Sequence, residues 1–578
     1  MSVEHREAVK RLNATVAHAV AAGLKRHGVT EFFGQSIPSS VILAACEMGL
    51  RQVGYRAENA GGAMADGYAR IARRIGVVMA QNGPAATLLV PPLAEALKAS
   101  VPVLALVQEV DRRSADRNAF QELDHTALFS GVSKWLRRVD HASRIDDYLD
   151  MAIAAATSGR PGPAVLLLPF DLLHEAEVER AERHAVLGTC PLDRVVAEPA
   201  RIDAAAELIA QAKRPLVIAG GGIHLSDAAA ELVELQDKAH LPVATTVMGK
   251  GAVDEHHPLS LGVATYFMGK GGMARHQRGL IDEADLVLLA GTRTNQNGTD
   301  SWTLYPRSAR YIHLDIDGQE VGRNYESVRL VGDAKATLAA LTRRLTELDL
   351  GRHRARRAGL ERRIAEGRAA HQTEAAALLA SNQAPIRPER IMAELDRKLT
   401  ANTIVVADAS YASIWIANYL TARHAGSRFL TPRGIAGLGW GLPMALGAKI
   451  AAPGSPVICV AGDGGFGHCW AELETARRMN VPLVLIVLNN GVLGYQRDAE
   501  YVRYRASTDA VDFTAVDHAG IARCCGCDGH RIERPEELAP ALEDALSADR
   551  LTLLDVIVDP LARPPLTFYK DTFPWAGG

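Results

Sequence analysis

Short apolar runs along this chain end in glycine-rich or polar turns, and segments with apolar residues at helical spacing follow them. The stretch 457–490 shows this pattern most completely. Its apolar run 457–461 ends at the glycine-rich turn 462–465, helical spacing follows over 470–477, and a second apolar run, 481–488, ends at two asparagines. The order strand, turn, helix, strand predicts a right-handed βαβ unit of a parallel sheet.

The same alternation recurs along the whole chain. It predicts an α/β protein with three domains of doubly wound, mostly parallel sheets. We expect the first domain at residues 1–185, the central domain at 199–345 and the third at 385–560, with residues 561–578 as a C-terminal tail or lid. A chain of 578 residues has room for about three domains of ordinary size.

Two segments outside these domains are distinctive. The stretch 351–378 is rich in arginine but also contains glutamates, and this mixture favours a solvated linker helix over a nucleic-acid-binding patch. The tail carries aromatic residues that either fold over an active site as a lid or pack on the surface. These residues are Tyr569, Phe573 and Trp575.

The composition and net charge restrict the classes of binding partner that the protein can have. The chain is 48% hydrophobic and 23% charged, as expected for a globular protein, and its net charge of −3 argues against nucleic acid as a main partner. No apolar run approaches the roughly 20 residues of a membrane-spanning helix. The first residues contain no apolar signal region, so we expect a cytoplasmic protein.

The stretch 457–490 also carries candidate metal ligands. Asp463 and Asn490 each follow a strand of the predicted βαβ unit, so both should lie at the same edge of the sheet, beside a helix N-terminus that favours anions. Carboxylate and amide oxygens suit Mg²⁺, which could hold a diphosphate where glycine lets it approach the backbone. The simpler alternative is that Asp463 only caps a helix.

Gly-Asp-Gly at 462–464 and Asn-Asn at 489–490 are separated by 24 residues. This spacing resembles the thiamine-diphosphate-binding motif of the decarboxylase and acetolactate synthase superfamily. The resemblance implies thiamine diphosphate and Mg²⁺ as cofactors. It also implies that Gly462, Asp463, Gly464, Gly465, Asn490 and Val492 bind them, with Asp463, Asn490 and the backbone carbonyl of Val492 as metal ligands.

Residues 56–70 resemble the superfamily segment R-H-E-x-x-A-x-x-M-A-D-G-Y-A-R, which carries a catalytic glutamate. Glu58 takes that position, with Ala57 and Asn59 departing from the usual histidine and glutamine. The resemblance implies that the Glu58 carboxyl binds the cofactor's pyrimidine N1′ and promotes its active tautomer. The alternative is a solvated acid at a helix start.

Residues 434–443 resemble the family motif G-x-M-G-x-G-L-P, whose bulky apolar residue bends the cofactor. Leu438 is our candidate for that cofactor-binding role, and ordinary core packing is the alternative. Residues 118–122 resemble the D-A-F-Q-E segment of acetolactate synthases. This second resemblance assigns Phe120 and Gln121 to the substrate, with Gln121 also as a catalytic candidate.

Other turn residues are expected at the same sheet edge. Asn82 is a cofactor-binding candidate, and Gln35, Ser36 and Tyr495 are substrate-binding candidates. His468 is either a proton donor or a packing residue.

The leading hypothesis is a lyase or transferase that cleaves or forms a carbon–carbon bond next to a carbonyl. It would act as an acetolactate-synthase-like decarboxylase and carboligase of a 2-oxo acid. Residues 462–467 and 472–475 also resemble 2-hydroxyacyl-CoA lyase and oxalyl-CoA decarboxylase, which would act on an acyl-CoA. A non-catalytic subunit of the same fold is a third hypothesis, and the presence of Glu58 and Asp463 argues against it.

The family resemblance has two further implications. Each active site would combine domains from two subunits, so a homodimer is the minimum assembly, and a homotetramer is common in the family. The central domain resembles one that binds FAD in some members, ADP or coenzyme A in others, and nothing in the rest. The glycines at 220–222 do not complete a G-x-G-x-x-G motif.

Overall fold

The computed structural model describes residues 14–176, 182–570, 572 and 573 of the chain. It contains three six-stranded sheets, and every strand pair within them is parallel. The predicted α/β class with doubly wound parallel sheets is therefore confirmed. The chain divides into two compact units: the described residues up to Leu192 with 433–437 and 446–452, and the remaining residues.

The first unit is built on a sheet in the order β2-β1-β3-β4-β6-β5. Its strands are β1 (Glu31–Gly34), β2 (Arg51–Val53), β3 (Gly76–Ala80), β4 (Val103–Glu109), β5 (Trp135–Arg138) and β6 (Ala164–Pro169). Strands β3 and β6, and β4 as far as Val107, are apolar and buried, because parallel sheets are covered on both faces.

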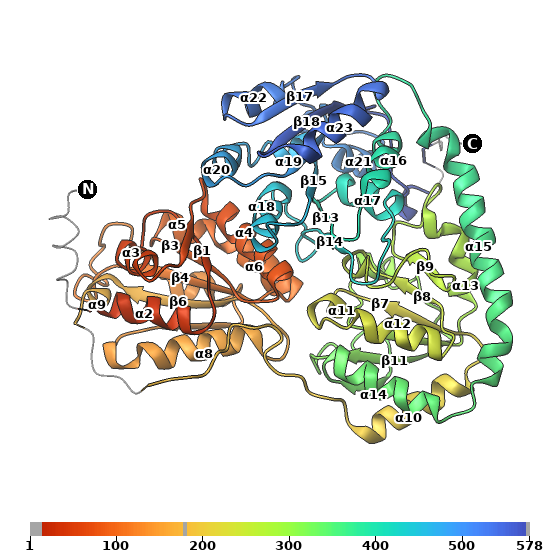
Figure 1. Cartoon of the computed structure of the whole chain (residues 1–578), viewed down its shortest axis with the longest axis horizontal. Helices are drawn as coiled ribbons and strands as arrows, with labels where there is room; N and C mark the ends of the chain where they lie inside the picture. The colour runs from red at the N-terminus through yellow and green to blue at the C-terminus, as the bar shows by residue number, and fades with distance from the viewer. Residues whose placement is uncertain (1–13, 177–181, 571, 574–578) are drawn as a thin grey trace. The chain divides into compact units, whose positions relative to one another are not determined.

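Helices cover both faces of this first sheet (Figure 1). One core contains α2 (Val16–Arg26), α3 (Ser39–Glu47) and α8 (Ile145–Thr157). The other face carries α4 (Glu58–Ala72), α5 (Pro84–Leu88) and α6 (Val90–Ala99). A Cβ atom on Gly62 of α4 would lie 2.5 Å from Pro92 of α6, so the small residues of α4 permit close helix packing. Shorter helices α7 (His125–Ser130) and α9 (Phe170–Leu173) complete this part.

The central sheet has the order β12-β11-β10-β7-β8-β9, which read in sequence is the 3-2-1-4-5-6 order of dinucleotide-binding folds. Its strands are β7 (Pro215–Ala219), β8 (Val243–Thr245), β9 (Ser260–Val263), β10 (Leu286–Ala290), β11 (Arg310–Asp315) and β12 (Val328–Val331). Helices α10 (Pro199–Gln211), α12 (Ala229–Lys238) and α14 (Ala334–Thr346) share a core on one face, and α13 (Arg278–Asp282) and α15 (Gly351–Leu379) lie on the other (Figure 1).

The arginine-rich segment forms α15, and two of its arginines form hydrogen bonds with the central domain. Arg363 makes two bonds to Glu283, at 3.0 and 2.9 Å. Arg368 donates to the carbonyl oxygen of Ser260 at 2.6 Å. The expectation of a solvated linker helix is therefore incomplete, since one stripe of this helix packs on the domain while the rest faces solvent.

The third sheet has the order β14-β13-β15-β16-β18-β17, the same relative order as the first. Its strands are β13 (Ile404–Ala407), β14 (Arg428–Leu430), β15 (Val457–Gly462), β16 (Val484–Asn489), β17 (Asp528–Ile532) and β18 (Thr552–Ile557). The predicted βαβ unit is present: β15 is followed by α19 (Asp463–Phe466), α20 (Glu472–Met479) and β16, and β15 pairs with β16 in parallel.

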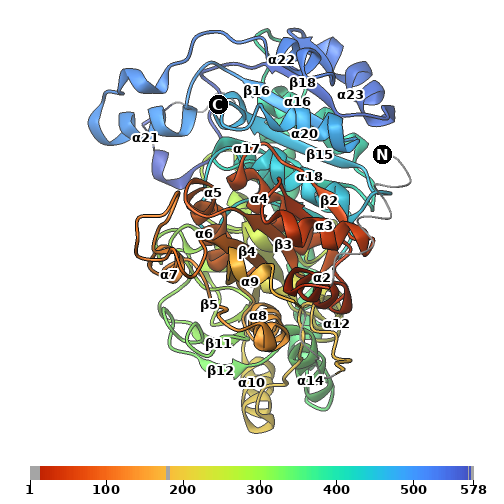
Figure 2. The ribbon, with the colours of Figure 1, turned by 90° about the vertical axis from the view of Figure 1, so that its left-hand side faces the viewer.

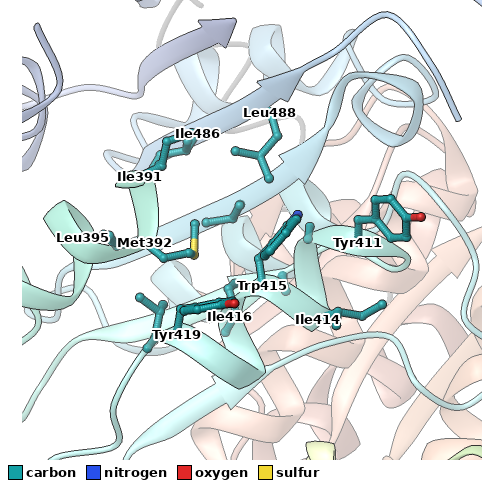
Figure 3. Close-up of a cluster of buried hydrophobic side chains, with 14 of the residues drawn as sticks. Ile391, Met392, Leu395, Tyr411, Ile414, Trp415, Ile416, Tyr419, Ile486 and Leu488 are labelled. Atoms are coloured by element: carbon teal, nitrogen blue, oxygen red, sulfur yellow. The ribbon is translucent and has the colours of Figure 1, made fainter. Parts of the chain in front are cut away.

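One face of the third sheet packs against α16 (Pro388–Lys398), α17 (Tyr411–Tyr419) and α23 (Leu538–Ser547). Figure 3 shows Trp415 and Tyr411 of α17 in this core, with Met392 of α16 and Leu488 of β16 nearby. The other face carries α20 and α22 (His518–Cys524) (Figure 2). Helices α18 (Gly441–Ala451) and α21 (Gly494–Tyr504) precede and follow the β15–β16 unit.

The described part of the tail packs into the third domain. Tyr569 is buried, and its hydroxyl forms a hydrogen bond with the hydroxyl of Tyr411. The ring of Phe573 stacks on that of Tyr501 of α21 at 5.5 Å between centroids. Trp575 lies outside the described residues. Among the described helices, none has both the length and the apolar character needed to cross a membrane.

Candidate active site

A pocket opens at the carboxyl edge of the third sheet. The loops after β13 and β15 leave neighbouring strands here, at the point where the strand order reverses, which is where doubly wound sheets bind ligands. The pocket is lined by both loops, by Leu438 and by residues after β16. They include Asp408, Ser410, Tyr411, Gly462, Asp463, Gly464, Gly465, Asn490 and Val492.

Asp463 joins two of these loops. Its Oδ1 accepts a hydrogen bond from the Gly464 N–H at 3.0 Å, and its Oδ2 accepts one from the Gly491 N–H at 2.7 Å. Burial raises the pKa of Asp463 to about 6, although these N–H groups act in the opposite direction. The Oδ1 of Asn490 accepts from the Val492 N–H at 3.1 Å. The structure thus brings Asp463, Asn490 and Val492 into one pocket.

The donor set of this pocket fits a hard divalent cation. Among the described residues, its lining includes the carboxyl groups of Asp408, Asp463 and Asp559 and no Lys, Arg or His. The described residues contain no cluster of three or more His, Cys, Asp or Glu, so a metal would be held by one carboxylate with amide and backbone oxygens. The Val492 carbonyl accepts from the Gly494 N–H at 2.9 Å and keeps a second lone pair. Oxygen ligands of this kind suit Mg²⁺.

Gly462 gives the pocket space beside its backbone. It is the last residue of β15, and a Cβ atom placed on it would meet no atom of the described residues within 4 Å. Leu438 is half-buried and lines the same pocket, so its side chain is available to a ligand there. The residues proposed to anchor a diphosphate and to bend the cofactor therefore share one cavity.

Two other residues predicted to belong to the site, His468 and Tyr495, do not line this pocket. His468 is exposed and is not among the residues that line the pocket, although a Cβ atom on Gly439 would lie 2.5 Å from the His468 Cβ. Tyr495 is half-buried, and its ring contacts those of Tyr411 and Phe568 at centroid distances of 6.0 and 5.8 Å. Tyr495 thus belongs to an aromatic group beside the pocket.

The candidates in the first unit follow neighbouring strands of its sheet. Gln35 and Ser36 come directly after β1 and are exposed, and the Gln35 side chain donates to the carbonyl oxygen of Arg56 at 2.8 Å. Glu58 is the first residue of α4 and is half-buried. It is an acidic residue in the first turn of α4, where the helix start favours a negative charge.

Asn82, Phe120 and Gln121 form one cluster in the first unit. The Asn82 amide donates to the carbonyl oxygens of Phe120 and Gln121 at 3.3 and 3.0 Å. The Gln81 amide donates to the side chain of Gln121 at 2.6 Å. Gln121 has a φ of 61°, and the Phe120 side chain is 83% exposed. The turn after β3 therefore holds the 118–122 loop and presents Phe120 to its surroundings.

Several residues of these sites were missed from the sequence. Asp408, Ser410 and Tyr411 line the pocket, and Gln81 fixes Gln121. Asp408 directly follows β13, and the neighbouring parallel strand β15 leads into the Gly-Asp-Gly turn, so a polar residue at this strand end was a usable signal.

Three doubly wound sheets, with an aspartate, an asparagine and glycines at a switch point, define an α/β enzyme built to bind a phosphorylated cofactor. Comparison with known families specifies the class. Residues 14–128 match "Thiamine pyrophosphate enzyme, N-terminal TPP binding domain". Residues 202–341 match the central domain of the same family, and residues 408–556 match its C-terminal TPP binding domain.

Relatives cover nearly the whole chain. It is 33% identical over 518 residues to a probable acetolactate synthase large subunit of Methanococcus aeolicus, covering 87% of this chain and 85% of the relative. The corresponding protein of Methanocaldococcus jannaschii is 32% identical over 568 residues, 95% of this chain and 93% of the relative. A sulfoacetaldehyde acetyltransferase of Castellaniella defragrans is 29% identical over 596 residues, 96% of this chain and 95% of the relative.

The chain belongs to the thiamine pyrophosphate enzyme family, which confirms the resemblance seen in its motifs. Thiamine pyrophosphate is another name for thiamine diphosphate. The protein is thus a thiamine-diphosphate-dependent enzyme of lyase or transferase type, and its chemistry is the making or breaking of carbon–carbon bonds.

Proposed function

We propose that this enzyme decarboxylates a 2-oxo acid and joins the remaining carbon fragment to a second carbonyl compound, as acetolactate synthases do. The observation that carries the proposal is the similarity to probable acetolactate synthase large subunits over 87% and 95% of the chain. The 118–122 loop supports it, because its Phe120 and Gln121 resemble residues that face the reacting carbonyl in those enzymes.

The pocket of the third sheet would hold the cofactor's diphosphate. Asp463, Asn490 and the Val492 carbonyl would hold Mg²⁺, whose positive charge would favour binding of the diphosphate. Gly462 would let the diphosphate approach the backbone, and Leu438 would support the bend between the two rings. Bound thiamine diphosphate supplies a nucleophilic carbon and an electron sink.

The first unit would supply the other contacts. The Glu58 carboxyl would hydrogen-bond the pyrimidine ring and hold the proton that its active tautomer needs. Asn82 would position the 118–122 loop against the cofactor. Gln121 would hydrogen-bond the substrate carbonyl and Phe120 would cover it, with Gln35, Ser36 and Tyr495 completing the substrate side. His468 is the candidate proton donor, and its exposure favours a role at the mouth of the site.

Assembly follows from the same resemblance. Because family members combine the glutamate domain of one subunit with the diphosphate domain of another, we propose a homodimer as the minimum and a homotetramer as the working form, in the cytoplasm. Light scattering during gel filtration measures the assembly. A monomer with full activity would exclude a shared site.

The central domain is the proposed place for a FAD, ADP or coenzyme A group. Its strand order supports such a group, whose site would lie near the glycine turns after β7 and β10. These turns pack backbone to backbone: the Gly222 N–H donates to the Gly291 carbonyl at 3.0 Å, so this donor is already used. Absorbance of the purified protein near 450 nm would reveal FAD.

The decisive experiment is a substrate screen with products identified by mass. Pyruvate and other 2-oxo acids should be consumed with formation of acetolactate or its analogues. Cleavage of a 2-hydroxyacyl-CoA or oxalyl-CoA, with no turnover of 2-oxo acids, would replace the proposal with the acyl-CoA alternative. Turnover of sulfoacetaldehyde with transfer of an acetyl group would instead align the enzyme with the acetyltransferase relative.

Two variants test the site assignments. Glu58→Gln should still bind thiamine diphosphate and lose most turnover, and unchanged turnover would exclude its catalytic role. Asp463→Ala should abolish Mg²⁺-dependent cofactor binding, and tight binding by this variant would exclude Asp463 as the metal ligand. Absence of turnover in the unmodified protein with every substrate tried would favour a non-catalytic subunit.

A further inference from the structure

Asp408 is a buried carboxyl group that the proposed mechanism does not use. It follows β13, is 1% exposed and lines the pocket of the third sheet. Its Oδ2 accepts from the Gly439 N–H at 3.0 Å, and its Oδ1 accepts from the N–H groups of Trp440 and Gly441, both at 3.2 Å. One side chain thus fastens three successive residues of the segment that carries Leu438.

The segment needs such an anchor because its backbone reverses at Gly439, which has a φ of 82°. Helix α18 begins at Gly441, so the Asp408 carboxylate also meets N–H groups that a helix start leaves without partners. All three partners are donors. A carboxylate can accept from each of them, whereas an amide of the same shape would turn an NH₂ group toward at least one.

Asp408 also touches the turn that carries Asp463. A Cβ atom on Gly465 would lie 2.1 Å from the Asp408 Oδ2, so this glycine lets the carboxylate pack directly against the 463–465 turn. A second glycine, Gly441, is required on the other side, where a Cβ atom would lie 2.9 Å from the Asp408 Cβ. The Asp408 carboxylate therefore lies in close contact with both the 463–465 turn and the segment that carries Leu438.

We propose that Asp408 is a positioning residue that sets the place of Leu438 relative to the 463–465 turn. This inference rests on the proposed function, in which the turn anchors the diphosphate and Leu438 supports the bend of the same cofactor. A fixed distance between the two contacts determines whether the bound cofactor reaches its reactive conformation. Asp408 would thus act on reactivity through Leu438 more than on affinity.

The test compares Asp408→Asn with Asp517→Asn. Asp517 caps α22, where its Oδ1 accepts from the Gly520 N–H at 2.7 Å, and it does not line the pocket, so it controls for the loss of a helix cap. In the cofactor-free protein, amide hydrogen exchange at residues 439–441 should accelerate at least tenfold in Asp408→Asn and stay unchanged in Asp517→Asn. Unchanged exchange in Asp408→Asn would overturn the proposal.

The second readout is the exchange of the C2 proton of bound thiamine diphosphate, followed by NMR after acid quenching. Asp408→Asn should slow this exchange and kcat at least tenfold, while the cofactor Kd and the substrate KM change less than threefold. Leu438→Ala should slow the C2 proton exchange similarly. The double variant should be no slower than the slower single variant, because both changes remove the same constraint on the cofactor. Additive losses would overturn the proposal.

Failure of the proposed function gives a different result. If the unmodified protein binds no thiamine diphosphate with Mg²⁺, the proposed function fails, and the role of Asp408 toward the cofactor fails with it. If the unmodified protein binds the cofactor and Asp408→Asn exchanges the C2 proton at the normal rate, only the inference about Asp408 is wrong. Should Asp408→Asn not fold, normal C2 exchange in Leu438→Ala would overturn the inference.

Discussion

Two glycines of the turn after β15 should respond to alanine in opposite ways. Gly462 has extended backbone angles, φ −77° and ψ 153°, which alanine adopts freely, and in the described part of the chain its added Cβ would meet no atom within 4 Å. At Gly465 the same atom would lie 2.1 Å from the Asp408 Oδ2. Gly462→Ala should therefore disturb only a ligand in the pocket, whereas Gly465→Ala should disturb the protein itself.

The magnitudes follow from these contacts. Gly462→Ala should leave the free energy of unfolding of the cofactor-free protein unchanged or raise it by roughly 0.4–1 kcal/mol, because alanine restricts the unfolded chain. Its methyl group would occupy the space in which we propose that the diphosphate binds, and it should weaken cofactor binding about 10- to 100-fold, or roughly 1.4–2.7 kcal/mol. Gly465→Ala should cost roughly 1–3 kcal/mol of stability, the usual cost of overpacking.

Stability is measured by urea unfolding of the cofactor-free protein, and affinity by titration with thiamine diphosphate at saturating Mg²⁺. Gly454→Ala is the matched control, since Gly454 lies in an exposed turn and its added Cβ also meets no atom within 4 Å. Normal cofactor affinity in Gly462→Ala would show that the diphosphate does not approach this backbone, and the assignment of the pocket would then be wrong.

Three further predictions concern buried polar groups of the central domain. The Lys250 ammonium lies 2.8 Å from both carboxylate oxygens of Glu255 in the interior. Lys250→Met should therefore lower the free energy of urea unfolding by roughly 3–5 kcal/mol, because it leaves the Glu255 charge buried without its partner. A loss below about 1 kcal/mol would contradict this prediction. The side-chain amide of Gln236 is buried with no hydrogen-bond partner among the described residues; Gln236→Leu should raise stability by roughly 1 kcal/mol, and a loss would show that the amide is satisfied by water. Burial lowers the pKa of His313 to about 4, so its neutral form stabilises the fold above pH 6.5, and between pH 6.5 and 4 stability should fall by roughly 3 kcal/mol on its account. A His313→Gln variant should show a shallower decline over that range, and an equal decline would exclude His313 as its source.

The stretch 457–490 shows which structural features the local sequence pattern can predict. Its apolar runs, glycine turn and helical spacing predicted a βαβ unit, and the structure has β15, α19, α20 and β16 in that order. The predicted meeting of Asp463 and Asn490 at one edge follows from the geometry of parallel strands, and both line one pocket. Hydrophobic periodicity and turn chemistry are local, so a single sequence contains them.

The roles of Asp408 and Gln81 could not be predicted from local sequence pattern. The importance of Asp408 depends on the N–H groups of residues 439–441, about thirty positions away, and on Gly465 in a third segment. Gln81 matters because the 118–122 loop returns to the turn after β3. The charge pattern of 351–378 predicted a solvated helix, whereas in the structure Arg363 contacts the Glu283 carboxylate and Arg368 contacts the Ser260 carbonyl.

The sequence by itself determined the fold class, the cofactor family and the residues that carry its motifs, because each depends on residue types at short, regular spacing. Only the tertiary structure decided which side chains share a pocket, which carboxyl group has three backbone donors, and that His468 is exposed outside that pocket. The reason is physical. Strand ends far apart in the chain become neighbours only when the sheet orders them, and burial, which sets the charge state and reach of a side chain, exists only in the assembled core.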